Sequence, residues 1–418
     1  MNTIKLKHLF INNGYKKLFI AYAISALGTN FTMVALPILI YKLTNSVLSV
    51  GLSFTMFTLP GIIFSPFIGF IVDNINKKKI MYLADFLRMF MVVLIPFLAN
   101  LRTPIFLYSD LFLYSCMNRC YNISSMTALP LITGKEKIHS ANAFLSTIDS
   151  ICDITGPLIS GLFIVYVNMN VCFFIDATSF LFSGTIIYFI NLSENIVKVN
   201  LNVENVFNNI ISGFKYSTSS KFLKHVILLY PAIYFFMGLQ TTAIFSCVQI
   251  FFKGNSLYYS FILAIMGLGG LIGALTSTKY GNVVKNETYI PLCYIIIGLL
   301  YILFSLSKNF PLELLICLFI GFFTVISSSL WMTVFHSSVS QKFKGRVFSF
   351  LSPIYSIAST SSLVLSSFIS KQIAFPIILR FDGCFMIIYL IIVTVFSPTS
   401  KYFVRNYKMD LGSDNNLE

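Results

Sequence analysis

Two aspartates four residues apart carry the most distinctive chemistry in the sequence. Asp149 and Asp153 lie in an apolar run at about 142–167, and their spacing places both on one face of a helix. Two carboxylates on one apolar face repel each other when both are ionised, so we expect one of them to exchange a proton near neutral pH. The alternative is a structural pair neutralised by Arg119 or Arg88. The first interpretation predicts a reversible proton carrier.

Other ionisable residues also lie inside apolar runs, where an unpaired charge costs a few kcal/mol. Asp85 and Arg88 are three residues apart and are expected to pair with each other. Snorkelling to the membrane interface is expected of three residues near the outer ends of their runs: Glu313, Arg380 and Asp382. The candidates for proton coupling are therefore Asp149, Asp153, Arg119 and Asp176.

The composition indicates the environment in which these residues act. The chain has 418 residues, of which 56% are hydrophobic and 11% are charged. A soluble domain carries about 25% charged residues, so this chain lacks the polar groups to cover a globule. The sequence also contains no metal-binding cluster, nucleophile elbow or phosphate loop. These features predict an all-α integral membrane protein that is not an enzyme and has no metal or cofactor.

The apolar runs predict twelve transmembrane helices in two groups of six. A span needs about 20 apolar residues. The runs fall at about 17–42, 47–72, 79–99, 104–129, 142–167, 171–191, 222–249, 256–278, 288–307, 311–335, 347–370 and 377–397. The expected organisation is an N-terminal six-helix bundle at 1–191, a cytoplasmic linker at 192–221, a C-terminal six-helix bundle at 222–398 and a cytoplasmic tail at 399–418.

The placement of basic residues predicts the orientation. With a cytoplasmic N-terminus, 21 of the 29 Lys and Arg residues fall on the cytoplasmic side and only five in the outer loops. The positive-inside rule then places both termini in the cytoplasm. The net charge of +14 is explained by basic loops facing anionic lipid rather than nucleic acid. The expected location is the cell membrane, without a cleavable signal peptide.

Two sequence motifs lie in the expected helices, one at the end of the second helix and one at a proline within the fifth. The pattern Gly69-x-x-x-Asp73 followed by Lys77 and Lys78 closes the second helix. Gly156, Pro157 and Gly161 lie in the fifth helix, where proline removes a backbone hydrogen bond and small residues permit close helix approach. In the eighth helix Gly273 repeats the position of Gly69, which indicates that the two halves are related.

With these motifs the sequence resembles the major facilitator superfamily, and within it the branch of macrolide-efflux-type and enterobactin exporters. The resemblance runs from about Asn13 to Pro398, and further passages carry it: Ala35-Leu-Pro37, Ala141-Asn142-Ala143, Asp176-Ala-Thr-Ser179-Phe180 and Gly345-Arg346-Val347. It implies export of an amphipathic organic molecule by alternating access, driven by proton entry. Substrate, protons and membrane lipid are then the partners, and a monomer is expected.

The resemblance also assigns roles to the two motifs. Asp73 would latch a cytoplasmic gate with Gly69, Lys77 and Lys78, docking near Gly345 and Arg346 at the start of the eleventh helix. The Gly156, Pro157 and Gly161 run resembles an antiporter signature, and the expected partners are Gly269 and Gly273 of the eighth helix. Candidate cavity-lining residues are Gln240, Thr241 and Trp331, although Trp331 is equally expected in an interfacial aromatic belt. A siderophore or peptide exporter and a non-transporting immunity protein remain open as alternatives.

Overall fold

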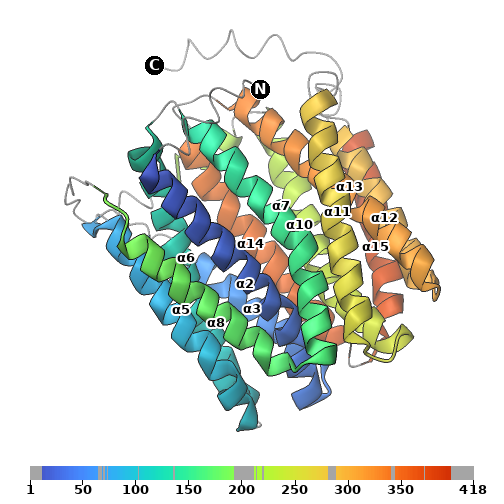
Figure 1. Cartoon of the computed structure of the whole chain (residues 1–418). Coiled ribbons are helices and arrows are strands. Elements are labelled where there is room, and N and C mark those ends of the chain that lie inside the picture. The colour runs from blue at the N-terminus through green and yellow to red at the C-terminus, as the bar shows by residue number, and fades with distance from the viewer. Residues whose placement is uncertain are drawn as a thin grey trace, which may run out of the picture. The chain divides into compact units, whose positions relative to one another are not determined.

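The computed structural model describes residues 12–64, 68, 71–72, 74–101, 103–134, 137–192, 211–212, 214–218, 221–280, 289–339, 344–370 and 372–396. Within these ranges the chain forms helices joined by short connections (Figure 1). Nine of the helices in these ranges are long and apolar enough to cross a membrane. The all-helical membrane fold expected from the sequence is therefore present, whereas twelve spans and cytoplasmic termini stay predictions.

Each long helix overlaps one of the apolar runs of the sequence. The first group comprises α2 (Asn13–Thr44), α3 (Val47–Ile63), α5 (Lys77–Asn100), α6 (Pro104–Thr133), α7 (Ile138–Tyr166) and α8 (Met169–Tyr188). The second group comprises α10 (Lys221–Phe251), α11 (Ser256–Tyr280), α12 (Tyr289–Leu306), α13 (Phe310–Ser338), α14 (Lys344–Ile369) and α15 (Phe375–Phe396).

Polar residues in the connections fix where several helices begin. The side chain of Asn12 accepts hydrogen bonds from the backbone N–H groups of Gly14 and Tyr15, at 2.9 and 3.2 Å, and so caps α2. Asn76 caps α5 in the same way through Lys79, at 3.1 Å. Such caps satisfy backbone donors that have no partner inside the helix. They fix the residues at which α2 and α5 begin.

The chain divides into two compact units. The first unit contains residues 1–202, 244–267 and 363–371, and the second contains 203–243, 268–362 and 372–418. Helices α10, α11 and α14 thus contribute residues to both units. The domain boundaries expected at residues 191 and 222 remain a prediction, and most of the linker expected at 192–221 lies outside the described residues.

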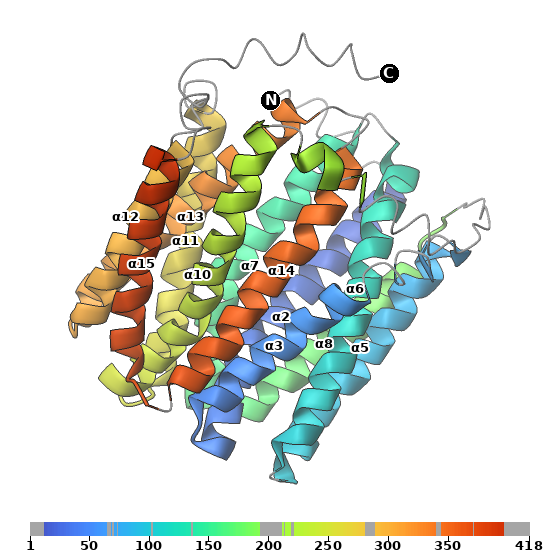
Figure 2. The ribbon, with the colours of Figure 1, turned by 180° about the vertical axis from the view of Figure 1, so that it is seen from behind.

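In the first unit, α2 packs on α7 and α8, while α5 packs on α6 and α8 and α3 packs on α6. Figure 2 shows α5 and α6 side by side. Close contact between α5 and α8 depends on Gly184, because a Cβ atom there would lie 3.1 Å from Cβ of Asp85. The same close contact brings polar side chains of α5 and α8 together inside the unit.

In the second unit, α12 packs between α13 and α15. Small residues again permit close approach, as in soluble and membrane helix pairs with glycine at the interface. A Cβ atom on Gly383 of α15 would lie 2.7 Å from the carbonyl oxygen of Gly298 on α12. On α14, Ser359 and Ser362 face Gly238 of α10, which supports small-residue packing as a role of the α14 serines.

Candidate functional site

The two aspartates singled out in the sequence lie on α7, next to α2. Tyr22 of α2 donates a hydrogen bond of 2.7 Å from its hydroxyl to Oδ1 of Asp149. Asp149 is half-buried and Asp153, one turn further along, is exposed. Among the described residues neither aspartate forms an ion pair, so the alternative of a pair neutralised by Arg88 or Arg119 is not what the structure shows.

The motif that follows these aspartates provides close contacts to two helices. Asn30 of α2 lies against Gly156, where a Cβ atom would approach the Asn30 amide carbon to 2.9 Å. Gly161 faces Ser260 of α11, and a Cβ atom on Gly267 of α11 would lie 2.8 Å from the carbonyl oxygen of Asp153. Pro157 is buried within α7. Helix α7 therefore meets α2 and the first part of α11 through small residues.

The two glycines of α11 that were expected to contact α7 belong to the second unit, where they pack on α13. Gly269 faces the carbonyl oxygen of Leu318 on α13, and a Cβ atom on Gly273 would lie 2.6 Å from the carbonyl oxygen of Phe322. The reason is helical geometry, because residues two apart point in nearly opposite directions and residues four apart point the same way. Within the first unit the contact with α7 comes from Gly267 and Ser260, and the contact expected of Gly269 and Gly273 remains a prediction.

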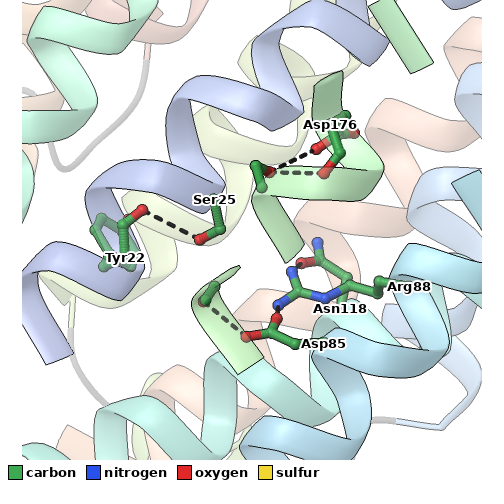
Figure 3. Close-up of polar contacts among 8 residues, drawn as sticks. Tyr22, Ser25, Asp85, Arg88, Asn118 and Asp176 are labelled. Atoms are coloured by element: carbon green, nitrogen blue, oxygen red, sulfur yellow. Dashed lines mark hydrogen bonds and ion pairs between the residues drawn. The ribbon is translucent and has the colours of Figure 1, made fainter. Parts of the chain in front are cut away.

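A buried polar cluster joins α5, α6 and α8 (Figure 3). Arg88 forms an ion pair with Asp85, as expected from their spacing, and donates a second hydrogen bond of 2.9 Å to Oδ1 of Asn118. Ser183 of α8 donates a hydrogen bond of 2.7 Å to the other oxygen of Asp85. Buried charges are tolerated when they are paired and hydrogen-bonded in this way. The cluster has the contacts of a structural ion pair.

Aromatic rings complete the environment of Arg88. Its guanidinium carbon lies 4.2 Å from the ring centroid of Tyr121 and 4.4 Å from that of Phe180. A guanidinium over an aromatic face gains electrostatic attraction of up to about 2 kcal/mol when it is desolvated. Arg88 is therefore enclosed by Asp85, Asn118 and two rings, and only its Nε atom meets no acceptor among the described residues.

Asp176 on α8 has a different environment from Asp85. It is completely buried, accepts a hydrogen bond of 3.4 Å from Ser179, and its Oδ2 atom meets no donor in the described part of the chain. Figure 3 shows it above the cluster of Asp85 and Arg88, toward α2. Gly28 of α2 makes room for it, because a Cβ atom there would lie 3.0 Å from Oδ1 of Asp176.

Arg119 lies on α6 against α3 rather than beside the α7 aspartates. A Cβ atom on Gly61 would lie 2.7 Å from the guanidinium carbon of Arg119, and the arginine is half-buried. Over the residues that the structure describes, it forms no ion pair with Asp149 or Asp153. The structure thus does not bring the expected counter-charge into contact with the expected proton carriers.

The cytoplasmic-gate residues are only partly described. Gly69 and Asp73 lie outside the described residues, and Gly345 and Arg346 belong to the first turn of α14 without described side chains. Lys77 and Lys78 begin α5, and Nζ of Lys78 lies 5.4 Å from the ring centroid of Tyr188. The gate latch remains a prediction.

In the second unit, two acids expected at the membrane interface are buried. Asp382 on α15 is 5% exposed and accepts a hydrogen bond of 3.0 Å from Gln240 of α10. Glu313 on α13 is completely buried. The snorkelling expectation was wrong for both. For Asp382 the reason is the close approach at Gly298 and Gly383, which encloses α15 beside α12.

Of the two remaining candidates for lining a cavity, Trp331 is buried and Thr241 is exposed. The Trp331 and Tyr230 ring centroids are 3.8 Å apart, and Phe335 lies 5.5 Å from Trp331. Trp331 is 9% exposed, which places it in an aromatic cluster within the second unit. Thr241 is exposed on α10, where its hydroxyl bonds to the carbonyl oxygen of Met237.

Sequence reasoning missed the uncharged partners of the charged groups. These partners are Tyr22 for Asp149, Asn118 for Arg88, Ser183 for Asp85 and Gln240 for Asp382. The two residues of each pair are 30 or more positions apart in the sequence. Their polar side chains within apolar runs were the available signal. The described residues contain no group of His, Cys, Asp and Glu side chains that could hold a metal ion.

Apolar helices enclosing buried ionisable groups define a multi-pass helical membrane protein. A solved POT family transporter in complex with a thioalcohol-conjugated peptide has the same fold, with a TM-score of 0.75 at 13% identity over 94% of this chain and 97% of that chain. A POT family transporter with 5-aminolevulinic acid gives 0.72 at 14% identity, over 94% and 97% of the two chains.

The model of the Major Facilitator Superfamily matches residues 18–363. The chain belongs to this superfamily, and it is a multi-pass protein of the cell membrane. The resemblance inferred from the sequence motifs is thereby confirmed.

The curated relatives carry the names of efflux proteins. Macrolide efflux protein A of Streptococcus pyogenes is 22% identical over 316 residues, covering 74% of this chain and 78% of that protein. Its namesake in Enterococcus faecalis is 21% identical, covering 71% and 93%. A Bacillus subtilis (strain 168) protein whose name proposes bacilysin export, BacE, is 24% identical, covering 54% and 57%. These relatives support the macrolide-efflux-type branch.

Proposed function

We propose that this protein is a secondary active exporter of an amphipathic small molecule, working by proton antiport and alternating access. The observation that carries the proposal is the environment of Asp149. It combines a hydrogen bond from Tyr22, partial burial and no ion pair within the described residues. A carboxyl with a neutral donor and a path to solvent can gain and lose a proton without breaking a salt bridge.

In this proposal Asp149 and Asp153 carry the proton, and Asp176 is a further candidate in the core of the same unit. Arg119 would supply the counter-charge only after a movement, since it now lies against α3. The α7 contacts at Gly156 and Gly161, and the contact of Gly267 with α7, are suited to an outer gate, because small residues let the helices approach closely and seal against each other.

The remaining roles follow the resemblance to the superfamily. Asp73, with Gly69, Lys77 and Lys78, would latch the inner gate on the start of α14 at Gly345 and Arg346. Twelve spans, cytoplasmic termini and a monomeric state complete the proposed architecture.

A macrolide-like molecule is the first candidate cargo, because relatives that match 74% and 71% of this chain bear macrolide efflux names. Export of such a molecule would confer antibiotic resistance. A siderophore or peptide exporter is the second candidate, supported by the relative named for bacilysin export. An anionic cargo has less support, because Arg88, which could bind an anion, is enclosed by Asp85, Asn118 and two rings.

Efflux assays in cells test this proposal. Cells with and without the protein are loaded with radiolabelled erythromycin or with ethidium, and retention is followed with and without an uncoupler. The proposal predicts lower retention in cells that contain the protein, and loss of the difference when the uncoupler is present. Equal retention of the probe in cells with and without the protein contradicts the proposal. If the protein confers resistance to the drug without any efflux of the drug, it is an immunity protein instead.

A further inference from the structure

We propose that Asp382 and Gln240 form a second proton-binding site, in the second compact unit and separate from the aspartates of α7. The site consists of a carboxyl on α15 held by an amide on α10. Proton binding at Asp382 stands on its own geometry, whereas its part in transport rests on the proposed antiport.

The burial of both residues is the first observation. Asp382 is 5% exposed and Gln240 is 3% exposed. Gln240 Nε2 lies 3.0 Å from Oδ2 of Asp382, while Oδ1 of Asp382 meets no donor among the residues described. An isolated carboxylate is far more costly to bury than a neutral acid. A carboxyl with one unsatisfied oxygen is therefore suited to take up a proton.

Among the residues that the structure describes, the groups that face Asp382 provide no opposite charge. Arg380 lies two residues earlier on α15, and its guanidinium binds the hydroxyl and carbonyl oxygens of Ser305, each at 3.2 Å. Two helical residues at this spacing point to nearly opposite sides. On α12 the titratable neighbour is Tyr301, which is buried, and on α10 the facing group is the uncharged Gln240.

A glutamine is the side chain that suits both protonation states of such a carboxyl. Its NH₂ group can donate to the ionised form, through the same hydrogen bond that it makes to Oδ2 of Asp382 in the structure. After rotation, its carbonyl oxygen can accept the O–H of the neutral acid. Gln240 thus holds Asp382 without adding a charge that would lock it in one state, which an arginine or lysine at this position would do.

Gln240 lies on α10, a helix that contributes residues to both compact units. Gln240 lies three residues before Ala243, the last α10 residue that clusters with the second unit. A change in how Gln240 holds Asp382 therefore acts on a helix that contributes to both units. This is the arrangement expected if protonation of Asp382 is linked to movement of the transporter.

Infrared difference spectroscopy tests proton binding directly on the purified full-length protein, without a substrate. Spectra are compared between mildly acidic and mildly alkaline pH, and the C=O band of protonated carboxyl groups is followed. We expect Asp382→Asn to remove one component of this band and Gln240→Leu to shift the same component. Asp110→Asn, a matched substitution of another buried acid, should leave that component in place.

The outcome that overturns the site is a pH-dependent spectrum that Asp382→Asn leaves unchanged. If the variant does not fold, Gln240→Leu keeps the proposal testable, because it retains the carboxyl and changes only its hydrogen bond. An unshifted band in Gln240→Leu also overturns the site.

Transport by proteoliposomes tests the second part of the inference. With radiolabelled erythromycin as the probe, the number of protons moved per molecule should fall by one in Asp382→Asn, relative to the unmodified protein. An unchanged ratio contradicts a coupling role. If the unmodified protein shows no proton-driven flux, the proposed antiport fails, while the infrared result still decides whether Asp382 binds a proton.

Discussion

The hydroxyl of Tyr22 on α2 donates a hydrogen bond of 2.7 Å to Oδ1 of Asp149 on α7. This bond ties the proposed proton carrier to a neighbouring helix through a neutral group. A hydrogen bond to a charged group contributes about 1.5–3 kcal/mol, so the bond is strong enough to orient the carboxyl and weak enough to change during a transport cycle.

Tyr22→Phe removes this donor and leaves the ring in place. We expect efflux to fall about tenfold, which corresponds to the loss of about 1.4 kcal/mol of orientation, and its pH profile to change. Initial rates of erythromycin efflux across a range of pH measure both effects. Tyr15→Phe is the matched control, because Tyr15 on α2 also bonds to α7, through the carbonyl oxygen of Ala141 at 3.1 Å. The account is contradicted if the two variants give the same pH profile.

The ion pair of Arg88 and Asp85 is expected to hold the first unit together rather than to move protons. Arg88→Ala leaves a buried carboxylate without its partner, which costs about 3–5 kcal/mol. Arg88→Lys should restore only part of the stability, since lysine cannot bridge Asp85 and Asn118 in one plane. Thermal unfolding in detergent measures both variants. A melting temperature for Arg88→Ala equal to that of the unmodified protein speaks against a structural role.

Two adjacent glycines on α11 should respond differently to the same substitution. Gly269 faces the backbone carbonyl of Leu318, which cannot rotate away, so we expect Gly269→Ala to destabilise the α11 and α13 contact by about 1–3 kcal/mol. At Gly270 a Cβ atom would meet a methyl group of Val325 at 3.0 Å and the carbonyl oxygen of Gly321 at an ordinary contact distance of 3.9 Å, so Gly270→Ala should be close to neutral. Melting temperatures compare the pair. Equal effects would mean that α11 does not pack on α13 in this way.

Trp331 is the only tryptophan in the sequence, so its fluorescence reports on the aromatic cluster alone. Because it is 9% exposed and lies 3.8 Å from the Tyr230 ring, we expect blue-shifted emission and little quenching by iodide. Tyr230→Leu should alter the spectrum. Tyr41→Phe, whose ring contacts Phe245 in the other unit, should not. Emission typical of a water-exposed indole would contradict the buried placement.

The positions of the helices could be predicted from the sequence because apolar length alone determines a span. The run at 79–99 became α5 at Lys77–Asn100, and the run at 256–278 became α11 at Ser256–Tyr280. The pairing of Asp85 with Arg88 was also predictable, since three residues on one helix fix the distance.

The direction in which each helix faces could not be predicted in the same way. Asp382 was expected at the interface and is enclosed beside α12, because Gly298 and Gly383 bring the two helices together. The packing of Gly269 against Leu318 of α13 was not predicted either, because it depends on a helix far away in the sequence. Contacts of this kind depend on helices far apart in the sequence, and one sequence does not contain that information.

The most direct test of the central claim uses the double variant Asp149→Asn and Asp153→Asn in proteoliposomes with an imposed proton gradient. Both substitutions keep the size of the side chains and remove the groups that bind the proton. The account predicts that the variant is inserted and folded as the unmodified protein is, but that gradient-driven export of radiolabelled erythromycin is lost. Export by the double variant at the rate of the unmodified protein would contradict the claim that these aspartates carry the proton.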